Sequence, residues 1–174
     1  MRKTVYISLG SNVGDRETSL SEAVRRLSAL GTVSHVSSLY ETEPVEFLNQ
    51  PWFLNCVVEL QTEKMPRNLL SAVLEIERAM GRRRTVAKGP RNIDLDLLLF
   101  GSSVIDTPQL TVPHPSMHER RFVLEPLAEI APDVRHPSLR RSAREMLSVL
   151  PKGSPTVRRF SAKSWPPVIE NAPS

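Results

Sequence analysis

The sequence has a single cysteine and few aromatic residues. Cys56 is the only thiol among 174 residues, which excludes an internal disulfide and any metal site built from several cysteines. Because its neighbours are apolar, we expect Cys56 to be a packed core residue and not a nucleophile. Aromatic residues make up 5% of the chain, whereas sheets that bind RNA normally display aromatic side chains on an open face. The composition therefore gives an RNA-binding sheet little support.

Long apolar runs are also absent. No stretch approaches the roughly 20 apolar residues that span a membrane. The opening residues, MRKTVYISLGSN, turn polar too soon for a signal peptide. We therefore expect a cytoplasmic protein with no membrane partner. A net charge of +4 is compatible with polyanionic partners, but it does not distinguish nucleotides from nucleic acid.

The spacing of apolar residues predicts six main elements in the first hundred residues. We expect a strand before residue 10, a helix ending at a C-cap at Gly31, strands over 32–40 and 53–60, a helix over 66–80 stopped by Gly81, and a strand over 92–100. This order predicts an α+β fold with a ferredoxin-like split βαβ core, a mainly antiparallel sheet and helices packed on it.

An added hairpin and C-terminal helices are expected after residue 100, with one helix interrupted at Pro126. Residues 1–151 are expected to form a single domain. Residues 152–174 are rich in proline and polar residues, and we expect them to form a flexible tail.

The strand over 92–100 carries two aspartates in an apolar run. Residues two apart in a strand share a face, so Asp94 and Asp96 are expected side by side, about 6–7 Å apart, opposite a face formed by Ile93, Leu95, Leu97 and Leu99. Like charges so placed repel each other. A divalent cation relieves that repulsion, and Mg²⁺ prefers one or two protein carboxylates together with substrate phosphates. The alternative is an exposed strand face with incidental charges.

A basic segment, GRRRTVAKGPR, precedes this strand. Its basic residues are Arg82, Arg83, Arg84, Lys88 and Arg91, with no acidic residue among them. Guanidinium groups bind phosphate through paired hydrogen bonds. Alone, the segment would be read as a solvated loop or a localisation signal. Next to paired aspartates it suggests a site for the phosphates of a nucleotide.

Two other patterns carry less weight. The GSNVGD turn lacks the lysine and serine of a phosphate-binding loop. His114 and His118 have a spacing that can bind zinc on a helix, but Pro113 and Pro115 disfavour a regular helix there.

The motifs together resemble the 6-hydroxymethyl-7,8-dihydropterin pyrophosphokinase family of folate biosynthesis. The resemblance runs through YISLGSN, SSLYETEP, FLN, GPRNIDLDLLLF and LTVPHPSMHERRFVLEPLAEIAPD, in the order found in that family. The GPR-x-I-D-L-D segment followed by VPHP is the most specific part. The alternative is a ferredoxin-like module that binds nucleotide or RNA without catalysis.

The resemblance implies transfer of pyrophosphate from ATP to the hydroxymethyl group of the reduced pterin, with AMP as the other product. It implies two Mg²⁺ ions on Asp94 and Asp96, and catalytic roles for Arg82 and Arg91. Residues expected to contact ATP are Glu77, Arg82, Arg84, Lys88, Arg91, Thr111, His114 and Arg120. Residues expected to contact the pterin are Thr42, Pro44, Val45, Phe53, Asn55 and Phe122.

The implied partners are the two small-molecule substrates, without nucleic acid, and the protein is expected to be a monomer. Three positions depart from the family pattern. Lys88 stands where many members have tryptophan, Phe53 often corresponds to tyrosine, and Gln109 lies where some members have arginine.

Overall fold

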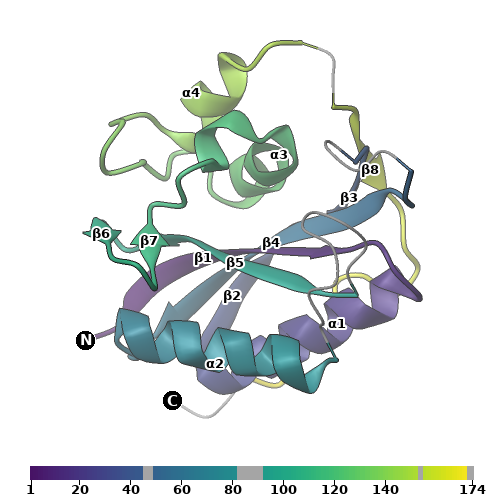
Figure 1. The fold of residues 1–174 in the computed structure, drawn as a ribbon, viewed down its shortest axis with the longest axis horizontal. Helices are drawn as coiled ribbons and strands as arrows, with labels where there is room; N and C mark the ends of the chain where they lie inside the picture. The colour runs from purple at the N-terminus through teal and green to yellow at the C-terminus, as the bar shows by residue number, and fades with distance from the viewer. Residues whose placement is uncertain (45–48, 82–91, 153–154, 172–174) are drawn as a thin grey trace.

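The computed structural model describes residues 1–44, 49–81, 92–152 and 155–171 (Figure 1). Its strands are β1 (Lys3–Ser11), β2 (Thr32–Val36), β3 (Leu39–Thr42), β4 (Phe53–Thr62), β5 (Asp94–Phe100), β6 (Ile105–Asp106), β7 (Thr111–Val112) and β8 (Val157–Phe160). Its α-helices are α1 (Arg16–Leu27), α2 (Pro66–Ala79), α3 (Arg121–Ile130) and α4 (Ala143–Ser148), with short 3-10 helices η1 (Ser28–Leu30) and η2 (Met117–Glu119).

The main sheet has the strand order β5-β1-β4-β3-β8, and β2 pairs with β4 next to β3. Every pairing in it is antiparallel. Helices α1 and α2 cover one face, whereas α3 and α4 lie over the other (Figure 1). The predicted α+β fold with a ferredoxin-like core is confirmed, and β6 and β7 form the expected hairpin.

Strand β4 alternates as predicted and separates two cores. Leu54, Cys56, Val58 and Leu60 belong to the core shared with α1 and α2. Val57 points the other way, into the core formed with α3 and α4. Burial raises the pKa of the Cys56 thiol far above its usual value. Cys56 is therefore a core residue, as its apolar neighbours suggested.

Strand β5 departs from simple alternation. It pairs with β1 through Leu97 opposite Ile7 and Leu99 opposite Tyr6, so the register shifts at Leu98. As a result Leu98 and Leu99 both pack in the core beneath α3, and Leu97 packs with α1 and α2. The prediction that Leu99 shares the face of Leu97 is wrong, because this β-bulge rotates the end of the strand.

Two predicted boundaries also differ. The strand expected over 32–40 is split into β2 and β3, because the Ser37 hydroxyl takes the place of a backbone carbonyl and accepts the Val57 N–H at 2.9 Å. Helix α3 continues through Pro126 without an interruption. Pro126 is buried in the layer that α3 forms over the sheet.

The segment expected to be a flexible tail contains a strand. β8 pairs antiparallel with β3, from Leu39 opposite Phe160 to Thr42 opposite Val157. The Trp165 indole N–H donates to the Ser37 carbonyl at 2.8 Å, and Asn171 exchanges hydrogen bonds with the backbone of Val33. Residues 155–171 therefore follow the edge of the sheet, which differs from the expectation.

Gly31 follows η1, but its backbone is extended and not left-handed as at a glycine C-cap. A Cβ at this position would lie 2.1 Å from the Gln61 carbonyl oxygen. We therefore expect Gly31→Ala to lower the free energy of unfolding by about 2–3 kcal/mol, because the backbone must move. Urea denaturation checks this, with Gly14→Ala as control. Gly14 has a φ of +69° and no neighbour within 4 Å, so its loss should be about 1 kcal/mol. Equal losses would contradict the packing explanation.

None of the helices in the described part of the chain has the length and apolar character needed to cross a membrane.

Candidate active site

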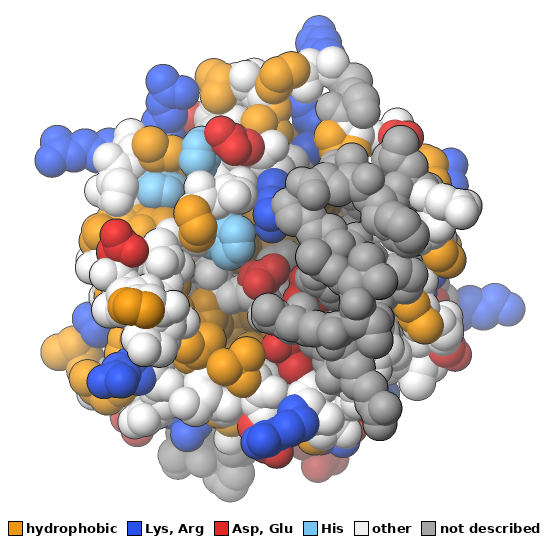
Figure 2. Space-filling model, viewed as in Figure 1, with side chains coloured by type: hydrophobic (Ala, Val, Ile, Leu, Met, Phe, Trp, Pro, Cys, Tyr) orange, Lys and Arg blue, Asp and Glu red, His pale blue; other side chains and the backbone are white. Residues whose placement is uncertain are grey.

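A cavity of about 670 Å³ lies at the β5 edge of the sheet and is lined by residues of β1, β3, β4, β5 and α2, and by Phe122 of α3. Figure 2 shows histidine, acidic and basic side chains gathered near the middle of this face. The cavity is lined by every described residue that the sequence assigns to ATP, pterin or metal: Thr42, Pro44, Phe53, Asn55, Glu77, Asp94, Asp96, Thr111, His114, Arg120 and Phe122. Segments far apart in the sequence therefore meet at one place. Val45, Arg82, Arg84, Lys88 and Arg91 lie outside the described residues.

The two aspartates of β5 face this cavity together. Asp94 is opposite Gly10 in the β1–β5 pairing, and Asp96 is opposite Ser8. Both are half-buried. The residue between them, Leu95, points into the core, as strand alternation requires. The alternation thus gives β5 an apolar face that fixes it in the sheet and a carboxylate face that is turned toward the cavity.

Glu77 adds a third carboxylate to the wall and also fixes β5 in place. It projects from α2, is only 4% exposed, and accepts the backbone N–H of Leu95 at 2.8 Å. β5 lies at the edge of the sheet among the described strands, so this hydrogen bond satisfies a backbone group on the side away from β1. Glu77 therefore holds the aspartate strand against the helix.

The aspartate pair suits Mg²⁺ in its donor chemistry. The ion prefers oxygen ligands and accepts one or two carboxylates when phosphates and water complete its shell. Within residues 1–44, 49–81, 92–152 and 155–171, no three His, Cys, Asp or Glu side chains come together as a metal site. A Mg²⁺ ion held by this aspartate pair could take its remaining ligands from water and from the phosphates of a bound nucleotide.

The other end of the cavity combines an amide with aromatic rings. The Asn55 amide nitrogen donates to the Thr42 hydroxyl at 2.8 Å, and both side chains are buried. Phe53 lies on the same face of β4, and Phe122 comes from α3. These groups can bind a flat ligand that carries hydrogen-bonding atoms on its edge.

Gly10 makes room for this arrangement and was missed by the sequence reasoning. It lies opposite Asn55 on β1, and a Cβ there would be 2.8 Å from the Asn55 side-chain oxygen. A glycine inside a predicted strand is a signal of such a close approach. Gln50 was also missed. It lines the cavity and accepts a hydrogen bond from the buried Asn12 at 2.8 Å.

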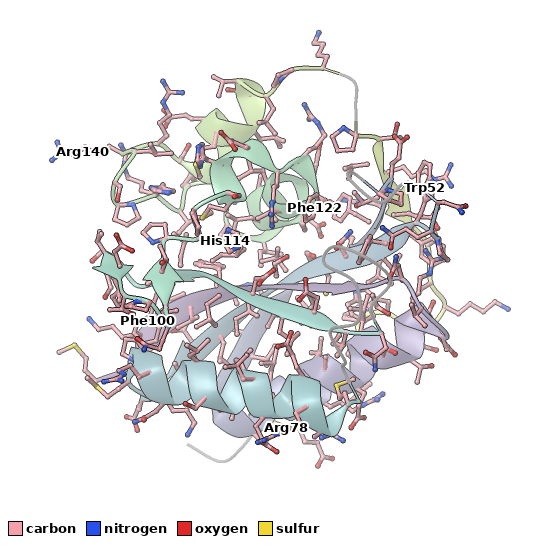
Figure 3. The ribbon with its side chains drawn as sticks, in the orientation of Figure 1. Trp52, Arg78, Phe100, His114, Phe122 and Arg140 are labelled. Carbon is pink, nitrogen blue, oxygen red and sulfur yellow. The ribbon has the colours of Figure 1, made fainter. Side chains whose placement is uncertain are left out.

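His114 lies above β5, where the β-bulge holds its backbone. Its N–H donates to the Leu98 carbonyl at 2.9 Å, and its ring Nδ1 accepts the Ser116 N–H at 3.1 Å. In Figure 3, His114 and Phe122 both lie on the α3 side of the sheet. Burial, followed by the nearby Arg120 charge, lowers the pKa of His114 to about 4, although Asp94 opposes the shift. The neutral ring then carries its proton on Nε2 and can donate it to a ligand.

We expect the His114 ring to titrate near pH 4 in the absence of divalent cations, and to stay neutral above about pH 5. Its pKa is below that of the unfolded chain, so its contribution to stability is complete above about pH 6.5 and is lost as pH falls toward 4. NMR titration of the histidine ring protons checks this, with His114→Asn to assign the signal. A midpoint near the ordinary value of 6.5 would contradict it.

His118 does not share the site of His114. Its ring packs edge-on against His136, with ring centroids 6.4 Å apart, and it does not line the cavity. The four-residue spacing therefore does not produce a shared histidine site, in agreement with the objection raised by Pro113 and Pro115.

Comparisons with known proteins identify one family from the sequence, and a solved structure agrees with the fold. The family described as 7,8-dihydro-6-hydroxymethylpterin-pyrophosphokinase (HPPK) matches residues 6–132. The 2-amino-4-hydroxy-6-hydroxymethyldihydropteridine pyrophosphokinase of Bacillus subtilis is 53% identical over 136 residues, covering 77% of this chain and 81% of that protein. The Aquifex aeolicus protein of the same name is 41% identical over 142 residues, covering 82% of this chain and 89% of that protein.

Some relatives are much longer. The folic acid synthesis protein fol1 of Schizosaccharomyces pombe is 41% identical over 98% of this chain, which spans 23% of that protein. A crystal structure of Plasmodium falciparum HPPK-DHPS has a TM-score of 0.71 at 16% identity, covering 85% of this chain and 45% of that chain. At this identity the structural likeness supports the fold alone.

Proposed function

Because this chain belongs to the 7,8-dihydro-6-hydroxymethylpterin-pyrophosphokinase (HPPK) family, we propose that it transfers pyrophosphate from ATP to 6-hydroxymethyl-7,8-dihydropterin. The products would be AMP and the pterin diphosphate ester, an intermediate of folate biosynthesis. The observation that carries the proposal is the single cavity in which the aspartate pair meets the Asn55 amide and two phenylalanine rings. One end suits a metal-bound triphosphate, and the other suits a flat heterocycle.

At the phosphate end, Asp94 and Asp96 would hold two Mg²⁺ ions, whose contribution is to neutralise the charge of the phosphates. Rigid backbone supports both aspartates, because β5 is fixed by β1 on one side and by Glu77 on the other. His114 would donate its Nε2–H to a phosphate oxygen, and Arg120 would add a positive charge. Thr111 and Glu77 would complete the ATP side, together with Arg82, Arg84, Lys88 and Arg91.

At the pterin end, the Asn55 amide would form hydrogen bonds with the edge of the pterin ring. Its nitrogen is already fixed by Thr42, which sets the orientation of its oxygen as an acceptor. Phe53 and Phe122 would stack on the two faces of the ring. Arg120 lies over Phe122, with its guanidinium carbon 5.6 Å from the ring centroid, and so joins the pterin wall to the ATP side. Pro44 and Val45 would supply backbone contacts.

In the reaction, the pterin hydroxymethyl oxygen would form a bond to the β-phosphorus of ATP. The bond from that phosphorus to the oxygen shared with the α-phosphate would break, which releases AMP, and the hydroxyl proton would pass to water. The residues of the chain act chiefly by holding the two substrates in line, an effect that can account for a large part of such a rate. His114 is not suited to be the base, because its Nδ1 is occupied and its pKa is about 4.

We propose that the enzyme acts as a monomer on two small-molecule substrates. We propose the cytoplasm as its location.

One assay tests the proposed function against its alternatives. Purified protein is supplied with ATP and Mg²⁺, and AMP formation is measured with and without the reduced pterin. AMP that appears only with the pterin supports the enzyme. ATP binding without AMP formation would instead indicate a nucleotide-sensing module, and RNA binding without turnover would indicate an RNA-binding module.

A further inference from the structure

The segment 155–171 lies beyond residues 6–132, over which the family model matches, yet it contacts a residue at the pterin end of the cavity. The Glu43 N–H donates to the Thr156 carbonyl at 3.0 Å, and the Thr156 N–H donates to the Glu43 carboxylate at 3.2 Å. Glu43 itself lines the cavity. β8 therefore continues the sheet directly alongside the pterin-binding wall.

One side chain of β8, that of Arg158, contacts the residues that precede Thr42 in β3 and Phe53 in β4. The Arg158 guanidinium donates twice to Oε1 of Glu41, at 2.6 and 3.1 Å, and its central carbon lies 4.8 Å from the centre of the Trp52 ring. Glu41 immediately precedes Thr42, and Trp52 immediately precedes Phe53. Trp52 lies close to β8 in Figure 3. Arg158 thus spans from the strand end of Thr42 to the strand end of Phe53.

Arg16 of α1 contacts the same two residues, Glu41 and Trp52. Arg16 donates to Oε2 of Glu41 at 3.0 Å and to the Trp52 carbonyl at 2.9 Å. Its guanidinium lies over the ring of Phe160, the other β8 residue on this face, at 5.5 Å. Although partial burial alone would raise the pKa of Glu41, the hydrogen bonds from Arg158 and Arg16 lower it. Each oxygen of this carboxylate is therefore held by one arginine.

We propose that Arg158 is a positioning residue for the pterin subsite, and that segment 155–171 sets the spacing between Thr42 and Phe53 on which pterin binding depends. This inference rests on the proposed function, because it assumes that the wall formed by Thr42, Phe53 and Asn55 receives the pterin. Among the described residues, none of β8 lines the cavity itself, and segment 155–171 reaches it through Glu41, Glu43 and Trp52, which lie next to Thr42 and Phe53. The effect should therefore be confined to one substrate.

The chain offers a closely matched control in the next residue. Arg159 has the same charge and nearly the same side-chain exposure, 62% against 65% for Arg158. Because neighbouring residues of a strand point to opposite faces, Arg159 contacts Tyr40 and Glu129 instead. Comparing Arg158→Gln with Arg159→Gln separates the effect of the Arg158 contacts with Glu41 and Trp52 from any general effect of charge on β8.

The test is steady-state kinetics of the two variants in the full chain, with thermal unfolding of each. Arg158→Gln is expected to raise the pterin KM about fivefold, with kcat and the ATP KM within about twofold, because an exposed ion pair and a cation–π contact are both modest. Arg159→Gln is expected to leave all three constants unchanged. Arg158→Lys, which keeps the charge, is expected to recover part of the loss.

Equal effects of Arg158→Gln and Arg159→Gln, or an equal loss on the ATP side, would overturn the positioning role. If Arg158→Gln does not fold, Arg158→Lys is compared with Arg159→Lys, and equal effects of these two variants would overturn the role in the same way. Failure of the wild-type chain to form AMP would instead remove the proposed function.

Discussion

Asp96→Asn is expected to reduce pyrophosphoryl transfer by about 10³-fold at saturating Mg²⁺, because metal stabilisation of the reacting phosphates contributes several kcal/mol. Asparagine keeps the shape of the side chain but removes the charge that is proposed to bind the ion. Asp96 lines the cavity from β5, where it lies opposite Ser8 and not opposite another carboxylate. Because the ion would stabilise the reacting phosphates, we expect the loss in kcat and not only in the affinity for ATP.

The measurement is kcat over a range of Mg²⁺ concentrations, with the unfolding transition as a check on folding. Asp133→Asn is the control, since it removes the same charge from a side chain that is 87% exposed and does not line the cavity. Near-normal turnover of Asp96→Asn at saturating Mg²⁺ would contradict the proposed role of Asp96 in holding the ion.

Asn55→Leu is expected to raise the pterin KM by about 10²-fold or more. Leucine has nearly the same size, but it removes both the partner of Thr42 and the acceptor for the edge of the ring. A site built to hydrogen-bond its ligand loses much affinity when a buried polar group is left without a partner. The ATP KM should change little, because Asn55 is not among the residues proposed to bind ATP.

Steady-state kinetics with each substrate varied in turn measures this effect. Gln61→Leu is the matched control: Gln61 is an amide on the same face of β4 that does not line the cavity. A pterin KM unchanged in Asn55→Leu, or raised equally in both variants, would rule out ring recognition by the amide.

The features that sequence predicted well depend on local alternation. β4 and the first half of β5 place Asn55, Asp94 and Asp96 on the face that carries the cavity, because each strand has one apolar side that must be buried. The resemblance to the family then assigned to one site several segments that are distant in the sequence and that no local pattern could predict to be close in space. The described residues among those assigned to the site all line one cavity, although their individual roles stay predictions.

The features that sequence did not predict depend on distant partners. The bulge at Leu98 follows from the pairing of β5 with β1, and the run of three leucines gives no local sign of it. β8 is a short strand with two adjacent arginines, so it lacks the alternation of a buried strand. Its partners, such as Glu41, lie more than 100 residues earlier in the chain. Such an edge pairing is decided by the tertiary fold and not by the strand itself.

The most direct test of pyrophosphoryl transfer follows the label from [γ-³²P]ATP through a single reaction with the reduced pterin. Transfer of an intact pyrophosphoryl group predicts that the label enters the pterin diphosphate and that unlabelled AMP forms in equal amount, with no ADP. Asp96→Asn is expected to lose both products. Formation of ADP with a pterin monophosphate, or release of labelled phosphate without any pterin ester, would contradict the central claim.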